Sequence, residues 1–245
     1  MEYRPACPIG HRLGKEKLQM ALVHPSPPGL VRSELAAPRL AYTMLYPLQL
    51  SFKIVAIAPQ IRMTDATGAP MLYVHQKAFK LKEAVTVYRD ESKQTALYTI
   101  SADRIIDFNA TYRIRDGGGR EVGALARRGR RSLWKARYDV LDTDGRSVYR
   151  IHEDEAWLKV LDAFVSQIPI VGWLGSYLIN PSYTVEADDP DTPEQEGDPV
   201  MQLQKQAAFF EGRFSIDLLG DLDPKQQELV VVALIMMVLR ERARG

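Results

Sequence analysis

The sequence predicts a mainly β fold, in which a closed antiparallel β-barrel of ten or more strands surrounds a buried hydrophobic helix at the C-terminus. Three observations predict it. Acidic turn residues recur at nearly constant spacing, apolar and polar residues alternate between them, and an apolar run lies near the end of the chain. The chain has 245 residues, which fits one closed all-β domain of about 200–250 residues.

The composition excludes several classes of protein. With 46% hydrophobic and 26% charged residues, the chain is neither disordered nor fibrous. Its 32 basic and 31 acidic residues give a net charge of +1, so attraction to nucleic acid or an anionic membrane would have to be local. The single Cys7 excludes an internal disulfide and a cysteine-based zinc site. No signal peptide is recognisable, and we expect a cytoplasmic protein, peripheral at the membrane if it binds lipid.

Residues 1–43 are predicted to form a loose, Pro-rich N-terminal arm. No period of 2 or 3.6 persists there, and the ordered domain is expected to cover residues 44–245. Two alternatives stay open for this arm: a native start at Met20 or Met44, or a tail that binds a partner. The arm holds six prolines, Pro5, Pro8, Pro25, Pro27, Pro28 and Pro38.

An internal repeat follows the arm. Four aspartates stand 25, 26 and 26 residues apart, and each lies between two short apolar or β-branched runs: Asp65, Asp90, Asp116 and Asp142. Aspartate side chains bond to their own backbone in turns, and the glycines after three of them supply positive φ angles. The spacing suits one β-hairpin per unit and is too short for a crossover helix.

Alternation identifies strands with one dry and one wet face. It is clearest at residues 106–115, where Ile106, Phe108, Ala110, Tyr112 and Ile114 alternate with polar residues, and it recurs at residues 134–140. Such strands form an antiparallel sheet that covers a single core. A sheet of ten or more strands has to curl, split or close, and something must fill it.

The C-terminal segment supplies the filling. Residues 229–239 are eleven consecutive apolar residues, and a helix that is apolar on all sides is buried in a core or a membrane. Eleven residues span roughly 16 Å, about half the ~30 Å of a bilayer core. Asp223 is a candidate N-cap, Pro224 fits the first helical position, and Gln226 completes a capping box. The β-branched residues 230–232 also suit a strand, but the composition favours a core helix at 224–242.

Several strings of residues support a family resemblance. They are residues 46–53 (YPLQLSFK), 76–85 (QKAFKLKEAV), 131–134 (RSLW) and the closing helix. With them, the chain resembles the tubby C-terminal-like superfamily over about residues 44–245, and within it the bacterial branch of the LURP-one-related proteins. The resemblance implies a twelve-stranded barrel around the helix. It also implies lipid-related activity, since better-studied relatives bind phosphoinositides or, like the phospholipid scramblases, act at membranes.

A basic region is the best candidate binding site. Residues 103–137 hold ten basic and four acidic residues, and guanidinium groups suit phosphate oxygens. A solvated turn is the alternative interpretation. The candidate residues for an anion or lipid are Arg127, Arg128, Arg130, Arg131 and Lys135, extended by Lys77, Lys80 and Lys82.

Two further segments bear on this site. Residues 186–199 form a predicted acidic loop with seven acidic residues and no basic one, which is expected to be mobile and to screen the basic surface. Residues 163–179 are uncharged but interrupted by proline and glycine, so a membrane span is not expected. Packing of a helix on the barrel mouth is one interpretation, and membrane contact through Trp173 and Tyr177 is the other.

Enzymatic motifs are incomplete. Residues 151–156 begin like a zinc-protease helix, but Ala156 stands where the second histidine is required. Residues 142–145 imitate a calcium loop, but Val140 and Ile151 occupy its first and last ligand positions. No catalytic, metal-ligating or cofactor-binding residue is therefore expected.

The sequence thus predicts a non-enzymatic binding module for an anionic ligand, such as a phospholipid or phosphoinositide headgroup. The alternative is a scramblase-like, membrane-associated protein. Binding of nucleic acid is a weaker alternative. The sequence leaves the oligomeric state open.

Overall fold

The computed structural model describes residues 43–53, 60–76, 84–103, 110–128, 137–154, 181–188, 197–206 and 211–242. The arm predicted at residues 1–43 lies outside this part of the chain except for Thr43, so its conformation stays a prediction.

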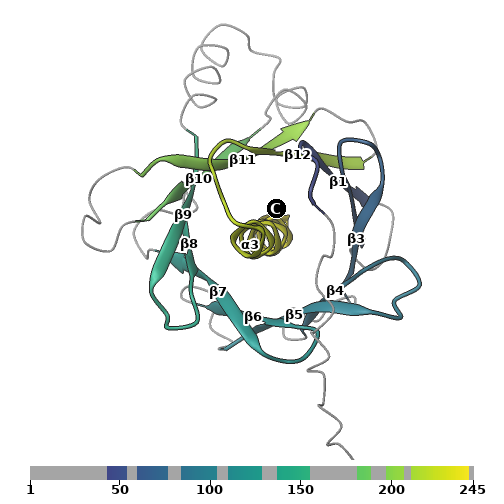
Figure 1. Cartoon of the computed structure of the whole chain (residues 1–245), viewed down its shortest axis with the longest axis horizontal. Coiled ribbons are helices and arrows are strands. Elements are labelled where there is room, and N and C mark those ends of the chain that lie inside the picture. The colour runs from purple at the N-terminus through teal and green to yellow at the C-terminus, as the bar shows by residue number, and fades with distance from the viewer. Residues whose placement is uncertain are drawn as a thin grey trace, which may run out of the picture. The chain divides into compact units, whose positions relative to one another are not determined.

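Twelve antiparallel strands close into a barrel (Figure 1). Each strand pairs with the next along the chain, and β1 pairs with β12 to close the ring. The predicted mainly β barrel is confirmed. The strands are β1 (Leu48–Lys53), β2 (Gln60–Thr64), β3 (Pro70–His75), β4 (Val85–Tyr88), β5 (Ala96–Ala102), β6 (Thr111–Asp116), β7 (Glu121–Arg128), β8 (Arg137–Leu141), β9 (Ser147–Glu153), β10 (Ser182–Ala187), β11 (Pro199–Gln206) and β12 (Glu211–Leu218).

Helix α3 (Pro224–Arg242) runs through the inside of the barrel, as the view in Figure 1 shows. The predicted capping box forms at its start. Asp223 Oδ1 accepts hydrogen bonds from the backbone N–H groups of Lys225 at 2.7 Å and Gln226 at 3.1 Å. Gln226 Oε1 in turn accepts the backbone N–H of Asp223 at 2.9 Å. These bonds satisfy N–H groups that have no partner within the helix.

The core is the contact between this helix and the inner faces of the strands. Residues 230–240 of α3 are all buried. Along β1, Leu48, Leu50 and Phe52 are at most 2% exposed, whereas the residues between them are partly accessible. Each large apolar side chain buried in this way contributes about 1.5–3 kcal/mol to folding.

Gly123 in β7 lets the helix approach the sheet closely. A Cβ atom at this position would lie 2.6 Å from the carbonyl oxygen of Leu141 and 2.8 Å from Leu229 Cδ1 of α3. Its φ of +155° is also one that other residues rarely adopt. Glycine is therefore required where α3 passes this strand.

The acidic repeat forms a series of matching hairpin turns. Oδ1 of the first residue of a turn accepts the backbone N–H of the residue four positions on, at 3.0 Å for Asp65, 3.0 Å for Asp116 and 2.9 Å for Asp142. The residue three positions on has a positive φ, at Gly68, Lys93, Gly119 and Gly145. The predicted strand–turn–strand repeat is thus present, and Lys93 takes the glycine position in the turn that Asp90 begins.

Hydrogen bonding lowers the pKa of these turn carboxyls. The backbone N–H of Arg146 is the main cause at Asp142. At Asp116, burial acts to raise the pKa, but hydrogen bonds from Arg120 and the charge of its guanidinium outweigh it. The pKa is lowered in the same direction at Asp65 and Asp90.

Replacing Gly123 by alanine should destabilise the fold. The added methyl has no room against Leu141 and Leu229, so we expect a loss of about 1–3 kcal/mol in the free energy of unfolding. Urea unfolding measures it. Ala126→Ser in the same strand is the control, and a Gly123→Ala protein as stable as this control would contradict the close approach of α3.

The turn carboxyls predict a loss of stability in acid. A carboxyl with a lowered pKa stabilises the fold fully above its ordinary pKa of about 3.9, and this contribution is lost as the pH falls through its folded value. We expect Asp142→Asn, which keeps an oxygen acceptor, to weaken the dependence of unfolding free energy on pH below about pH 4. Asp144→Asn removes the same charge from the same turn but leaves the bonds to Asp142, and serves as control. Equal slopes for the two variants would contradict the prediction.

Candidate functional site

The two ends of the barrel differ. Because neighbouring strands are antiparallel, the short Asp turns all lie at one end, where α3 begins, and α3 ends at the other. We call this second end the C-terminal mouth; it is marked by Glu241 and Arg242, the last two residues of the helix.

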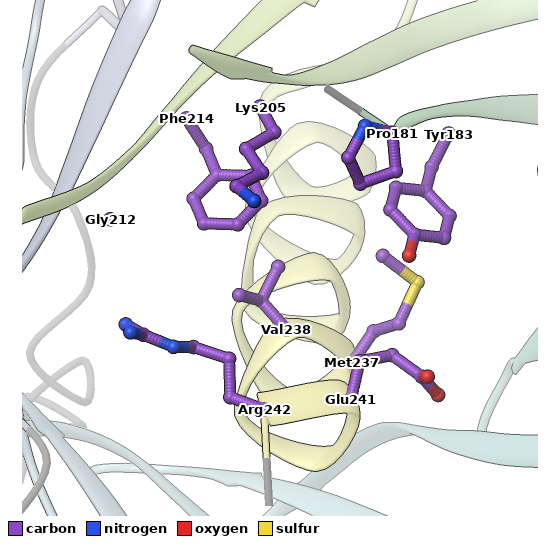
Figure 2. Close-up of a pocket in the computed structure, with 9 residues that line it drawn as sticks. All are labelled: Pro181, Tyr183, Lys205, Gly212, Phe214, Met237, Val238, Glu241 and Arg242. Atoms are coloured by element: carbon purple, nitrogen blue, oxygen red, sulfur yellow. The ribbon is translucent and has the colours of Figure 1, made fainter. Parts of the chain in front are cut away.

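A pocket lies at the C-terminal mouth, between the last turns of α3 and strands β10, β11 and β12 (Figure 2). Its volume is about 230 Å³. Apolar groups make up most of its wall, and charged side chains stand at its rim. Its lining residues are Pro181, Tyr183, Lys205, Gly212, Phe214, Met237, Val238, Glu241 and Arg242.

Lys205 is a cation on the inner face of the sheet. It pairs with Phe214 of β12 and follows the buried Leu203 by two residues, so both parity and register place it inside the barrel. Figure 2 shows its side chain beside the ring of Phe214, over the pocket. Its ammonium group forms no ion pair or side-chain hydrogen bond with any residue that the structure describes. It is therefore available to an anionic ligand.

Arg242 supplies the second cation, from the end of α3. Its guanidinium carbon lies 4.6 Å from the centre of the Phe52 ring, within the range of a cation–π contact. Gly212 makes room for it, because a Cβ atom there would lie 3.1 Å from Arg242 Nη1. Burial lowers the pKa of Arg242 from its usual value, but a guanidinium still carries its charge at neutral pH.

Two tyrosines act on these polar groups, Tyr183 in the pocket wall and Tyr138 behind Glu241. Burial raises the pKa of Tyr183, and the charges of Glu153 and Glu241 raise it further, so its hydroxyl is neutral and able to donate. Tyr138, which is 1% exposed, donates its hydroxyl to Glu241. One carboxylate of the rim is thus already engaged by the protein.

Comparison with known proteins decides the family. A model of the LURP-one-related family matches residues 71–238. The chain belongs to the LURP-one-related family. The resemblance inferred from the sequence is thereby confirmed.

A solved structure gives a second comparison. An X-ray structure of a protein from Arabidopsis thaliana aligns with a TM-score of 0.45 and 16% identity, covering 82% of this chain and 94% of the plant chain. A search of curated proteins found no match to this LURP-one-related chain.

The structure separates the two described members of the predicted basic site. Arg127 pairs with the inward-facing Tyr138 and Arg128 with the exposed Arg137, so the two arginines lie on opposite faces of β7. Arg128 is held by Asp139 on the outside, with 2.6 Å between Nε and Oδ2. Burial nevertheless raises the pKa of Asp139. These two arginines do not present one common surface to a ligand.

The other predicted contact residues fall outside the described part of the chain. They are Lys77, Lys80, Lys82, Arg130, Arg131, Lys135, Trp173 and Tyr177. Their roles, and the scramblase-like alternative that depends on residues 163–179, stay predictions.

The predicted acidic loop at 186–199 is shorter than expected. Strand β10 continues to Ala187 and β11 begins at Pro199, because Glu186 and Ala187 still pair with Arg150 and Tyr149 of β9. The carboxylate of Asp188 pairs with Arg150 of β9 at 2.5 Å. At least this acidic residue is therefore bound to its own sheet and does not screen the predicted basic site; residues 189–196 are not described.

The pocket residues were missed because they are dispersed in the sequence. A signal was nonetheless present for Lys205, since it occupies the inward parity of a strand whose earlier inward residues are Met201 and Leu203. Arg242 lies one helical turn after Val238, on a helix without a polar side. A cation at a position where the pattern predicts an apolar residue is the signal that could have identified both Lys205 and Arg242.

Two features are absent from the part of the chain that the structure describes, a group of metal ligands and a membrane-spanning helix. No three His, Cys, Asp or Glu side chains there are grouped as metal ligands would be. In that same part of the chain, no helix has the length and apolar content to cross a membrane.

Proposed function

We propose that this LURP-one-related barrel is a non-enzymatic binding module for an anionic ligand, such as the headgroup of an anionic phospholipid. One observation carries the proposal: two cations, Lys205 and Arg242, line the same largely apolar pocket. Charge-assisted hydrogen bonds from such cations favour carboxylate or phosphate oxygens. The module would act in the cytoplasm, peripherally at a membrane.

The arrangement of the pocket supports this site over the outer surface of β7 and β8. On that outer surface, Asp139 already pairs with Arg128. At the C-terminal mouth, the cations come from two separate elements, β11 and α3, and adjoin apolar side chains. Charges at an apolar wall attract an anion more strongly than charges in open solvent do.

Vesicle flotation tests the proposal. We expect the protein to float with vesicles that contain phosphatidylglycerol and not with pure phosphatidylcholine. Lys205→Gln combined with Arg242→Gln should weaken the binding about tenfold or more, since two charge-assisted contacts are lost.

The matched control is Lys53→Gln combined with Arg137→Gln. These two exposed cations lie at the same end of the barrel, but on its outer face, and their removal changes the net charge by the same amount. The control should float like the wild type. If both double variants lose binding equally, the attraction is a general one of the surface, and a site at the pocket is contradicted. If flotation does not depend on the anionic lipid content of the vesicles, binding of anionic lipid is contradicted altogether.

A further inference from the structure

We propose that the pocket at the C-terminal mouth takes the single alkyl chain of an amphiphile whose head carries one negative charge. The inference rests on the proposed function and makes it specific, because it assigns the chain to the space between α3 and strands β10–β12. The anionic head then lies on Lys205 and Arg242.

The walls of the pocket suit hydrocarbon. Phe214 of β12 and Met237 and Val238 of α3 are buried core residues that also line the cavity. In Figure 2, the rings of Phe214 and Tyr183 stand on opposite sides, with Val238 facing the space between them. An ordered water needs two to four polar partners, and the side chains of Phe214, Met237 and Val238 offer no hydrogen-bonding N–H or O–H group. Alkyl groups are the occupants that such a surface favours.

The pocket is larger than another cavity that described residues line at the same end. A second cavity at the same end, next to Tyr112 and Arg240, measures only about 10 Å³. The larger one, of about 230 Å³, occurs where β12 has Gly212 in an inward position opposite Phe52. An occupant that binds the folded chain and not the unfolded chain should raise the stability of the protein.

Size limits the occupant to one chain. The volume of about 230 Å³ is slightly below the range of about 300–1,000 Å³ that is usual for sites of drug-sized ligands. Such a space holds part of one alkyl chain and excludes a second chain or a fused-ring lipid.

The charge of the rim indicates the charge of the head. The carboxylate of Glu241 already accepts a hydrogen bond from Tyr138, and Glu153 of β9 pairs with Tyr183 across the strands. Lys205 forms no ion pair or side-chain hydrogen bond with a described residue, so the pocket offers one uncommitted cation next to Arg242. The neutral hydroxyl of Tyr183 adds a hydrogen-bond donor. A carboxylate or a phosphodiester, each with one negative charge, matches this rim; a fatty acid and a phospholipid are the two sources of that chemistry.

Calorimetric titration of the full chain with butanoate, octanoate and dodecanoate tests the inference. We expect binding to tighten about fourfold for each added methylene until the pocket is filled, and the bound chain to raise the melting temperature. Val238→Phe, which fills the pocket with an apolar ring, should abolish the dependence on chain length. Methyl octyl phosphate, a phosphodiester, and octanoate then distinguish the two head groups.

The charge of the head is tested separately. Lys205→Gln combined with Arg242→Gln should weaken the binding of octanoate about tenfold or more. The binding of neutral octyl glucoside should stay unchanged. The outer-face control, Lys53→Gln with Arg137→Gln, should bind octanoate like the wild type.

The outcomes separate this inference from the proposed function. If butanoate binds as tightly as dodecanoate, or if no alkyl anion binds while anionic vesicles still do, the chain-binding pocket is wrong and the proposed function stands. If octyl glucoside binds as tightly as octanoate and the two charge variants behave alike, the selection of an anion fails as well, and the proposed function falls with it.

Discussion

Helix α3 has no polar side, and the rest of the structure depends on enclosing it. Residues 230–239 are at most 5% exposed, and no flat or open sheet could cover all of their surface. The barrel depends on the helix in turn, because the side chains that point into a barrel of twelve strands need an apolar partner in its interior. Helix and barrel therefore stabilise each other, and neither is expected to fold without the other.

Polar side chains of the barrel contact α3 near both of its ends. Glu228 accepts a hydrogen bond from Tyr98 in the second turn of α3, and Glu241 accepts one from Tyr138 in the last. Near the exit, the guanidinium carbon of Arg240 lies 5.4 Å from the ring centre of Tyr112. Cations in the last turn also interact favourably with the helix dipole. The pocket lies at the end of α3 where Arg240, Glu241 and Arg242 follow the apolar run, so apolar and charged side chains both line it.

The fold could be predicted from the sequence because it follows from local patterns. The Asp turns, the period of two and the wholly apolar run each specify an element, and closure of the sheet follows from the need to bury that run. The site could not be predicted in the same way. Its cations come from β11 and α3, and the space for Arg242 depends on Gly212 in a third element. Of the arginines at residues 127–131, the two that the structure describes, Arg127 and Arg128, are neighbours on one strand and therefore lie on opposite faces.

Hydrogen exchange of the backbone amides of α3 tests the central claim most directly. If the helix is the enclosed core of the barrel, amides 230–239 should exchange only through global unfolding, with protection at least equal to that of the barrel strands. Added urea should lower the free energy of opening measured by exchange of these amides as much as it lowers the free energy of global unfolding. Exchange of α3 that is faster than that of the strands, and insensitive to global stability, would show that the helix leaves the barrel and would contradict the account.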